Sequence, residues 1–247
     1  MNYYISDLHF CCASQLSGSG SGYDEREYKT LEEMHADMLA RWNRKVTNGD
    51  TVYILGDISK RGKSEELVAL VAQLKGHKIL VHGNHDDLSD YRLRQLFEEV
   101  CNYKEITDNI RGNAYKLVLC HYPILFWNGQ HRGNILLYGH THRSPEDVFF
   151  QDCIKRLNER KDLHEEDQDF LAINVGCMQP YMNYEPQSLK ELLEARGIEI
   201  PEKKKKEKEE EKRVNKPISL LLDTKGPEIR IGKFADPNGI ELKAGDV

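Results

Sequence analysis

The amino-acid sequence predicts an α/β fold with a largely parallel central sheet, and three observations carry this prediction. Short, nearly continuously apolar runs alternate with amphipathic helical patterns, which is the order expected of strand–helix–strand units. The runs are apolar at consecutive positions, as is typical of strands buried on both faces. One segment, Asn109–Asn113, has the composition of a hairpin turn, so part of the sheet is expected to be antiparallel.

The predicted strands are rich in β-branched and aromatic residues and are followed by polar residues or glycine. They span Asn2–Ser6, Thr51–Leu55, Lys78–His82, Tyr115–Cys120 and Ile135–Tyr138. Helices are predicted where amphipathic stretches follow residues that cap helix N-termini, such as Thr30 and Ser64. The predicted helices cover Thr30–Val46, Ser64–Leu74 and Leu88–Val100.

Composition places the chain among globular proteins. The 247 residues include 35 Lys and Arg against 41 Asp and Glu, which gives a net charge of −6. This length is ample for a sizeable core, and the recurring apolar runs exclude collagen-like and wholly disordered chains. The acidic balance argues against non-specific nucleic-acid binding. No apolar run reaches the roughly 18 residues that a membrane-spanning helix needs, so no membrane partner is expected.

The N-terminus and the cysteines point to a cytoplasmic location. A basic region followed by an apolar stretch is missing from the N-terminus, so no secretory signal is expected. The 6 cysteines lack the regular spacing of a disulfide framework.

The segment Ser14–Gly22 is rich in Ser and Gly. It lacks the known phosphate-binding glycine patterns and is interpreted as a mobile loop.

Side chains that bind metals follow each of the 5 predicted strands. They are Asp7 and His9, then Asp57, then Asn84, His85 and Asp86, then His121, and finally His140 and His142. Ligands of open α/β sheets bind at the carboxyl ends of the strands, so these side chains are expected to converge. Carboxylate, imidazole and amide ligands suit Mn, Fe, Zn or Co better than Ca. Together they are enough for two ions that share one carboxylate and activate a bridging water as a nucleophile.

The order of these blocks, DxH, GD, GNHD, H and GHxH, resembles the calcineurin-like metallophosphoesterase family. The resemblance extends from residue 1 to about residue 195 and is greatest to the small bacterial members. It implies a layered α/β/β/α sandwich with a dinuclear metal site at the carboxyl ends of the strands. It further implies that Asp57 bridges the two metals. One metal would then be bound by Asp7, His9, Asp57 and His142, and the other by Asp57, Asn84, His121 and His140.

The resemblance also assigns residues to the reaction. His85 would face the substrate and either stabilise the phosphorus centre or protonate the leaving oxygen, and Asp86 could orient its ring. Asn84 and Arg61 would contact the substrate phosphate. Lys60 stands where the protein phosphatase branch has an acidic residue that pairs with the catalytic histidine, which argues against a protein phosphatase.

The implied activity is that of a hydrolase acting on ester bonds. The chain would cleave a phosphomonoester or phosphodiester by attack of a metal-bridging hydroxide, with two divalent ions as cofactors. Manganese is preferred, and Fe, Zn, Co and Ni are alternatives. A nuclease, a cyclic-nucleotide phosphodiesterase and a non-catalytic metal-binding scaffold remain open. The expected partner is a small phosphate ester, and the sequence leaves its identity and the oligomeric state open.

The C-terminal region differs from the rest. Every residue of Glu202–Arg213 is charged, which predicts a linker without an apolar face. The predicted organisation is a catalytic domain over 1–197, a charged linker over 198–215 and a fragment over 216–247. That fragment contains DTKGPEIR, which resembles a segment of pyruvate kinase, but it is too short to fold alone or to carry kinase activity.

Overall fold

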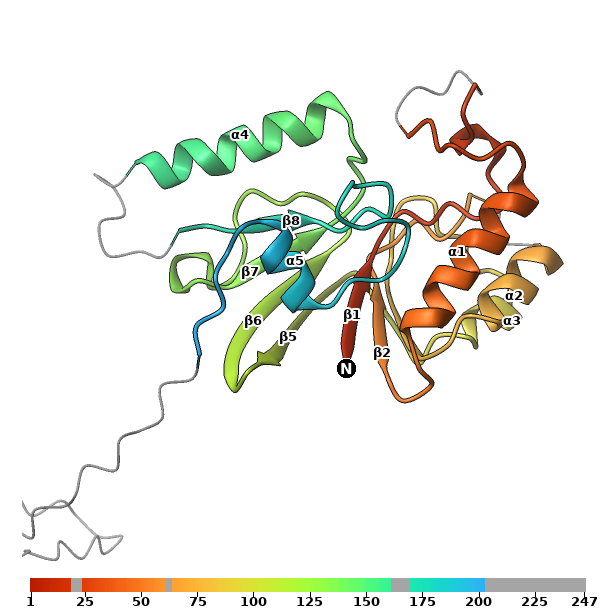
Figure 1. The fold of residues 1–247 in the computed structure, drawn as a ribbon, viewed down its shortest axis with the longest axis horizontal. Coiled ribbons are helices and arrows are strands. Elements are labelled where there is room, and N and C mark those ends of the chain that lie inside the picture. The colour runs from red at the N-terminus through yellow and green to blue at the C-terminus, as the bar shows by residue number, and fades with distance from the viewer. Residues whose placement is uncertain (19–23, 61–63, 161–168, 203–247) are drawn as a thin grey trace, which may run out of the picture. The chain divides into compact units, whose positions relative to one another are not determined.

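In the residues that the computed structural model describes, 1–18, 24–60, 64–160 and 169–202, two four-stranded sheets form the centre (Figure 1). The first sheet is parallel and contains β1 (Asn2–Ile5), β2 (Thr51–Ile54), β3 (His77–Val81) and β4 (Glu99–Cys101), in that order. The second contains β5 (Tyr103–Ile110), β6 (Asn113–Cys120), β7 (Ile135–Tyr138) and β8 (Ala172–Asn174). Only the β5–β6 pair of this second sheet is antiparallel.

The two sheets meet where β1 and β8 end. The backbone N–H of Ser6 donates to the carbonyl of Val175 at 2.8 Å, and Ser6 and Gly176 form a parallel bridge. Because β1 and β8 run in the same direction at this junction, the parallel strands of both sheets end at one edge. The residues that follow the strands of either sheet are therefore brought into one region.

The side chains of β6 alternate between two hydrophobic cores, which shows how the layers stack. Leu117 and Leu119 belong to the core shared with the first sheet, whereas Val118 and Cys120 belong to the core that includes Phe150 of α4. Successive side chains of a strand point to opposite faces, so the second sheet lies between the first sheet and α4 (Pro145–Glu159). Each fully buried leucine here stabilises the fold by about 1.5–3 kcal/mol.

Helices cover the outer faces of both sheets, which confirms the layered α/β/β/α arrangement. In Figure 1, α1 (Leu31–Lys45), α2 (Glu65–Ala72) and α3 (Tyr91–Arg94) lie beside the first sheet. The last helix, α5 (Leu189–Ala195), contacts β1 and β5 and buries Leu189, Leu192 and Leu193.

Two of the three predicted helices are confirmed. The Thr30 hydroxyl caps α1 by accepting from the backbone N–H of Glu33 at 3.2 Å. Ser64 caps α2 through Leu67 N–H, and this helix ends at Ala72, two residues before the predicted Leu74.

The third predicted helix, Leu88–Val100, is wrong. Only Tyr91–Arg94 is helical, and Glu99–Cys101 forms β4. Val100 pairs with Leu80 of β3, so sheet pairing outweighed the helical spacing of the apolar residues between Leu88 and Val100.

The predicted hairpin is confirmed. Ile110 pairs with Asn113, and the two residues between them, Arg111 and Gly112, have φ of 51° and 80°. Positive φ at both central positions is the geometry of a type I′ turn, whose twist matches that of the flanking strands.

The chain after α5 runs along this hairpin. The Arg111 guanidinium forms an ion pair with Glu202 at 2.7 Å, and Asn113 Nδ2 donates to the carbonyl of Pro201 at 2.7 Å. The described residues fall within one compact unit, Met1–Lys203. Residues 203–215 of the predicted linker and the pyruvate-kinase-like fragment over 216–247 lie outside the described residues, so the domain boundaries stay a prediction.

The six cysteines are free thiols, and four of them, Cys11, Cys12, Cys120 and Cys177, are buried. In the described part of the chain, every helix is too short or too polar to span a bilayer.

Candidate metal centre

The loops that follow the strands hold most of the predicted metal ligands in a left-handed backbone conformation. Positive φ angles occur at Asp7 (56°), His9 (48°), Asp57 (56°), His140 (69°) and His142 (50°). Few residues other than glycine adopt this region, because Cβ crowds the backbone there. Strain of this kind persists where surrounding structure enforces it, and it concentrates at functional sites.

Glycines allow the ligand loops to approach one another. A Cβ on Gly56 would lie 2.5 Å from Nδ1 of His121, and one on Gly139 would lie 2.5 Å from Oδ2 of Asp7. Both distances are too short for any side chain. The glycines in the GD and GH blocks are therefore required by the close approach of two ligand-bearing loops.

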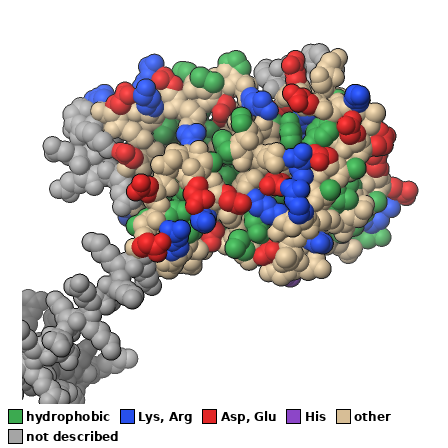
Figure 2. Space-filling model, in the orientation of Figure 1, with side chains coloured by type: hydrophobic (Ala, Val, Ile, Leu, Met, Phe, Trp, Pro, Cys, Tyr) green, Lys and Arg blue, Asp and Glu red, His purple; other side chains and the backbone are tan. Residues whose placement is uncertain are grey.

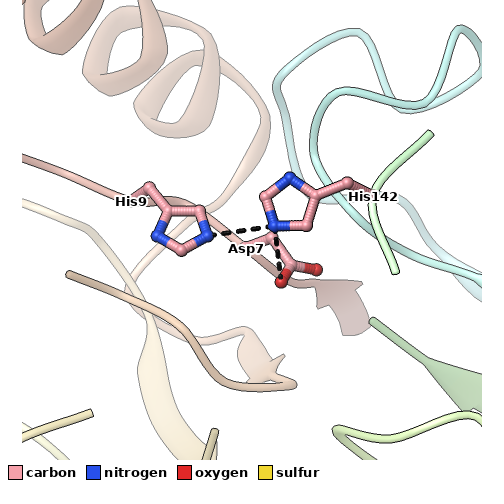
Figure 3. A group of neighbouring side chains, drawn as sticks. All are labelled: Asp7, His9 and His142. Carbon is pink, nitrogen blue, oxygen red and sulfur yellow. Dashed lines mark hydrogen bonds and ion pairs between the residues drawn. The ribbon is translucent and has the colours of Figure 1, made fainter. Parts of the chain in front are cut away.

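One group of ligand atoms comes from Asp7, His9 and His142 (Figure 3). The Nε2 atoms of His9 and His142 lie 3.1 Å apart, and His142 Nε2 lies 3.6 Å from Asp7 Oδ1. Two ligand nitrogens at right angles around one ion, each about 2.1 Å from it, are about 3.0 Å apart. The spacing of the rings therefore fits a shared cation.

A second group contains Asp57, His121 and His140. His121 Nδ1 donates to the carbonyl of Leu55 at 2.7 Å, which leaves Nε2 of the neutral ring as an acceptor. That Nε2 lies 3.0 Å from Oδ1 of Asn84 and 3.6 Å from Oδ1 of Asp57. Asn84 thus joins this group, in which acceptor atoms face one another around a common point.

Asp57 faces both groups. Its Oδ2 lies 3.7 Å from Nε2 of His9, while its Oδ1 lies 3.6 Å from Nε2 of His121. The carboxylate is buried, and Oδ1 also accepts the backbone N–H of His85 at 2.9 Å. One carboxylate oxygen for each group is the arrangement that a bridging ligand needs.

The protonation chemistry also suits cations. Burial lowers the pKa of His9, His121 and His140, so these rings are neutral and their lone pairs are available near pH 7. Burial raises the pKa of Asp7 to about 7. Nδ1 of His9 is the one buried side-chain nitrogen or oxygen in the described part of the chain without a hydrogen-bond partner. The neutral rings of His9, His121 and His140 therefore offer lone pairs that divalent ions could accept.

His85 and Asp86 follow Asn84 in the sequence, and their side chains have different structural roles. The His85 ring lines the cleft beside the ligands, with its centroid 5.6 Å from that of His9. The Asp86 carboxylate accepts the backbone N–H groups of Asp57, Ile58 and Gly83 at 3.0, 2.8 and 2.8 Å. Asp86 thus ties two ligand loops together, and none of these bonds reaches the His85 ring, so its role in orienting that ring stays a prediction.

The structure adds two residues that sequence reasoning missed. Asp24 Oδ1 accepts a hydrogen bond from Nδ1 of His142 at 2.7 Å, and Oδ2 of Asp24 accepts from Nη2 of Arg26 at 2.9 Å. Arg26 is fully buried and donates to the carbonyls of Leu8 at 2.6 Å and Asp7 at 2.7 Å. Burial raises the pKa of Asp24, but its hydrogen bonds to His142 and Arg26 outweigh this effect. The pKa is therefore lowered and Asp24 stays ionised.

A third cluster, Cys11, His35 and Glu66, has metal-binding side chains but a simpler explanation. Nε2 of His35 accepts the backbone N–H of Cys11 at 2.9 Å, so the proton of the neutral ring sits on Nδ1. Nδ1 lies 3.5 Å from Oε1 of Glu66. The lone pair of Nε2 is thus already used within the protein. Arg61, the other predicted phosphate contact, lies outside the described residues.

Comparisons with known proteins agree with this geometry. The family model for calcineurin-like phosphoesterases matches residues 3–200. An uncharacterized protein of Methanocaldococcus jannaschii is 30% identical over 149 residues, which are 60% of this chain and 72% of that protein. The Gene 66 protein of Mycobacterium phage D29 is 29% identical over 163 residues, covering 57% of this chain and 77% of the phage protein.

Among solved structures, a protein of unknown function from Aquifex aeolicus has the same fold. It aligns with a TM-score of 0.55 at 23% sequence identity, covering 79% of this chain and 98% of that one.

Proposed function

Since the chain belongs to the calcineurin-like phosphoesterase family, we propose that it is a hydrolase that cleaves small phosphate esters with two divalent metal ions. The observation that carries this proposal is the convergence of two groups of acceptor atoms on Asp57, which offers one carboxylate oxygen to each. Two ions held in this way suit an in-line displacement at phosphorus, because they can stabilise the attacking and leaving oxygens together.

The ligand residues would divide between the two ions as their positions suggest. Asp7, His9 and His142 would hold one ion, Asn84, His121 and His140 would hold the other, and Asp57 would contact both. When bound, such ions supply Lewis-acid activation of water and of the phosphoryl group. Nitrogen and oxygen ligands of this kind suit Mn, Fe, Zn, Co or Ni, and we propose manganese as the first ion to test.

The protein's own contribution would be to position groups around the substrate. Asp57 fixes the loop of His85 through the backbone N–H of that residue, and the His85 ring stands in the cleft outside both ligand groups. From there the ring would donate a proton to the leaving oxygen, or a hydrogen bond to the phosphoryl group as its charge grows.

The test is hydrolysis of p-nitrophenyl phosphate and of its bis ester by the full chain after loading with Mn, Fe, Zn, Co or Ni in turn. We expect turnover that depends on metal and is abolished by a chelator. A folded, metal-loaded protein that cleaves neither ester with any of these ions would contradict the proposal.

A nuclease is less well supported. Nuclease activity on long substrates needs a basic groove beside the site, because most contacts to nucleic acid are made with phosphates. On the face drawn in Figure 2, Lys and Arg side chains are interspersed with Asp and Glu. Within the described lining of the cleft, Lys60 is the one lysine or arginine. A small phosphate ester is therefore the favoured substrate.

The cytoplasmic location stays a prediction.

A further inference from the structure

The cleft beside the metal ligands contains polar residues that bind no metal. It has a volume of about 280 Å³, and its lining includes Gln15 and Lys60 next to His85. Pockets for drug-sized molecules are typically about 300–1,000 Å³, so this cleft is slightly smaller and suits a small ligand.

Lys60 brings a positive charge to this cleft. It lines the cleft together with His9 and His140, one side chain from each ligand group. A cation here attracts the part of a substrate that carries the most negative charge.

Gln15 brings an amide that lacks a partner. The residue is only 7% exposed and lines the cleft. Its backbone N–H and carbonyl are bonded to Cys12 and Arg26, but its side-chain amide has no hydrogen bond to any residue in the described part of the chain. Because this amide is not among the fully buried atoms without a partner, it keeps contact with solvent in the cleft, where a ligand can replace water.

Cys12 fixes both residues. Its carbonyl accepts the backbone N–H of Gln15 at 3.1 Å, and its Sγ accepts the backbone N–H of Lys60 at 3.4 Å. The thiol in turn donates to the carbonyl of Phe10 at 3.3 Å. The backbones of Gln15 and Lys60 are therefore held in place before any substrate arrives, which reduces the entropy lost on binding.

We propose that Lys60 and Gln15 form a recognition subsite for the doubly charged phosphoryl group of a small phosphomonoester, which selects monoesters over diesters. This inference rests on the proposed function and names its substrate class. A phosphomonoester carries up to two negative charges at neutral pH, whereas a diester carries one. A diester also places a second carbon substituent where the subsite would hold a free oxygen.

The experiment compares two esters that share one leaving group, p-nitrophenyl phosphate and methyl p-nitrophenyl phosphate. The metal-loaded full chain is assayed beside Lys60→Met and Gln15→Leu. The matched controls are Lys155→Met, on an exposed face of α4, and Gln73→Leu, at the exposed C-terminal end of α2. Metal content and melting temperature are measured on each variant, and inorganic phosphate binding is measured by calorimetry.

We expect the parent to favour the monoester in kcat/KM. Lys60→Met should lower kcat/KM for the monoester by about tenfold or more, the size of one lost charge-assisted hydrogen bond, and should change the diester less. Gln15→Leu should act in the same direction by a smaller factor, and both variants should bind inorganic phosphate more weakly. The control variants should match the parent.

A parent that favours the diester, or a Lys60→Met variant with an unchanged ratio of the two activities, overturns the subsite. If the loaded parent cleaves neither ester, the proposed function fails instead. The subsite is then judged by inorganic phosphate alone, and equal dissociation constants for the parent and Lys60→Met would overturn it. If Lys60→Met or Gln15→Leu fails to fold, the other variant carries the same comparison.

Discussion

Asp24 Oδ1 lies 2.7 Å from Nδ1 of His142, and this hydrogen bond turns the opposite ring nitrogen, Nε2, toward Asp7. Asp24 is itself held by Arg26, which also binds the carbonyls of Asp7 and Leu8. A carboxylate that accepts from a metal-binding histidine fixes the tautomer and orientation of the ring. Asp24 and Arg26, in the segment after β1, therefore fix the orientation of His142, the candidate ligand that follows β7.

Replacing Asp24 should weaken metal binding without removing a ligand. In Asp24→Asn we expect about 10- to 100-fold lower affinity for one of the two ions, the usual effect of losing such a partner. Manganese titration of the chelated protein by calorimetry measures this. Asp37→Asn is the matched control, because Asp37 pairs with Arg41 and Tyr28 on the surface of α1. Equal affinities in Asp24→Asn and the parent, with both folded, would show that the Asp24 contact is only structural.

Replacing His85 should separate catalysis from metal binding. The ring belongs to neither ligand group, so His85→Asn should keep both ions and lose about 100- to 10,000-fold in turnover, as expected for a lost general acid. His77→Asn, at an exposed ion pair with Glu98, is the control and should behave as the parent. Equal turnover in His85→Asn and the parent would remove the catalytic role of His85, and metal binding without turnover in both would support a metal-binding scaffold.

Adding one methyl group at Gly139 should damage the site. A Cβ there would contact the Ser6 hydroxyl and Oδ2 of Asp7, so Gly139→Ala should lower the free energy of unfolding by about 1–3 kcal/mol and reduce metal content. Gly49→Ala is the control, because the nearest atom to its Cβ, Oγ1 of Thr47, is 4.0 Å away. Denaturant unfolding and metal analysis of both variants test this. A Gly139→Ala variant as stable as Gly49→Ala would contradict the predicted close approach.

Removing the residues after Glu202 should leave the site intact. Every residue placed in the metal centre or the cleft precedes Ala195, and the family model ends at residue 200. Deleting Lys203–Val247 is therefore expected to preserve metal content and turnover. Loss of either in a folded, truncated chain would show that the C-terminal segment contributes to function.

The sequence predicted the parts of the fold that local chemistry determines. The five predicted strands correspond to β1, β2, β3, β6 and β7, and each lies within two residues of its expected ends. They could be predicted because each is a short apolar run followed by polar residues or glycine. The candidate ligands could be predicted for the same reason, since each one follows a strand. The helix predicted over Leu88–Val100 failed because β4 depends on pairing with β3, which spacing within the segment does not reveal.

Some missed elements carried a local signal. Ser188 and Glu191 form a capping box at α5, and Ser144 precedes a proline at the start of α4. Both patterns are visible in the sequence. The pairing of Asp24 with His142 left no such trace, because 118 positions separate the two residues. The Ser- and Gly-rich segment Ser14–Gly22 predicted a mobile loop. Leu16, in its described part, forms a bridge with Arg26, and residues 19–22 lie outside the described residues.

Each ligand group takes side chains from both sheets. Asp7 and His9 follow β1 and Asp57 follows β2, whereas His121, His140 and His142 follow strands of the second sheet. An ion between His9 and His142 would cross-link positions 133 residues apart, closing a long loop much as a disulfide does. The unfolded chain cannot present these ligands together, so metal binding and folding are coupled. Chelation should therefore loosen the seam between the two halves of the sandwich, and its effect should extend well beyond the cleft.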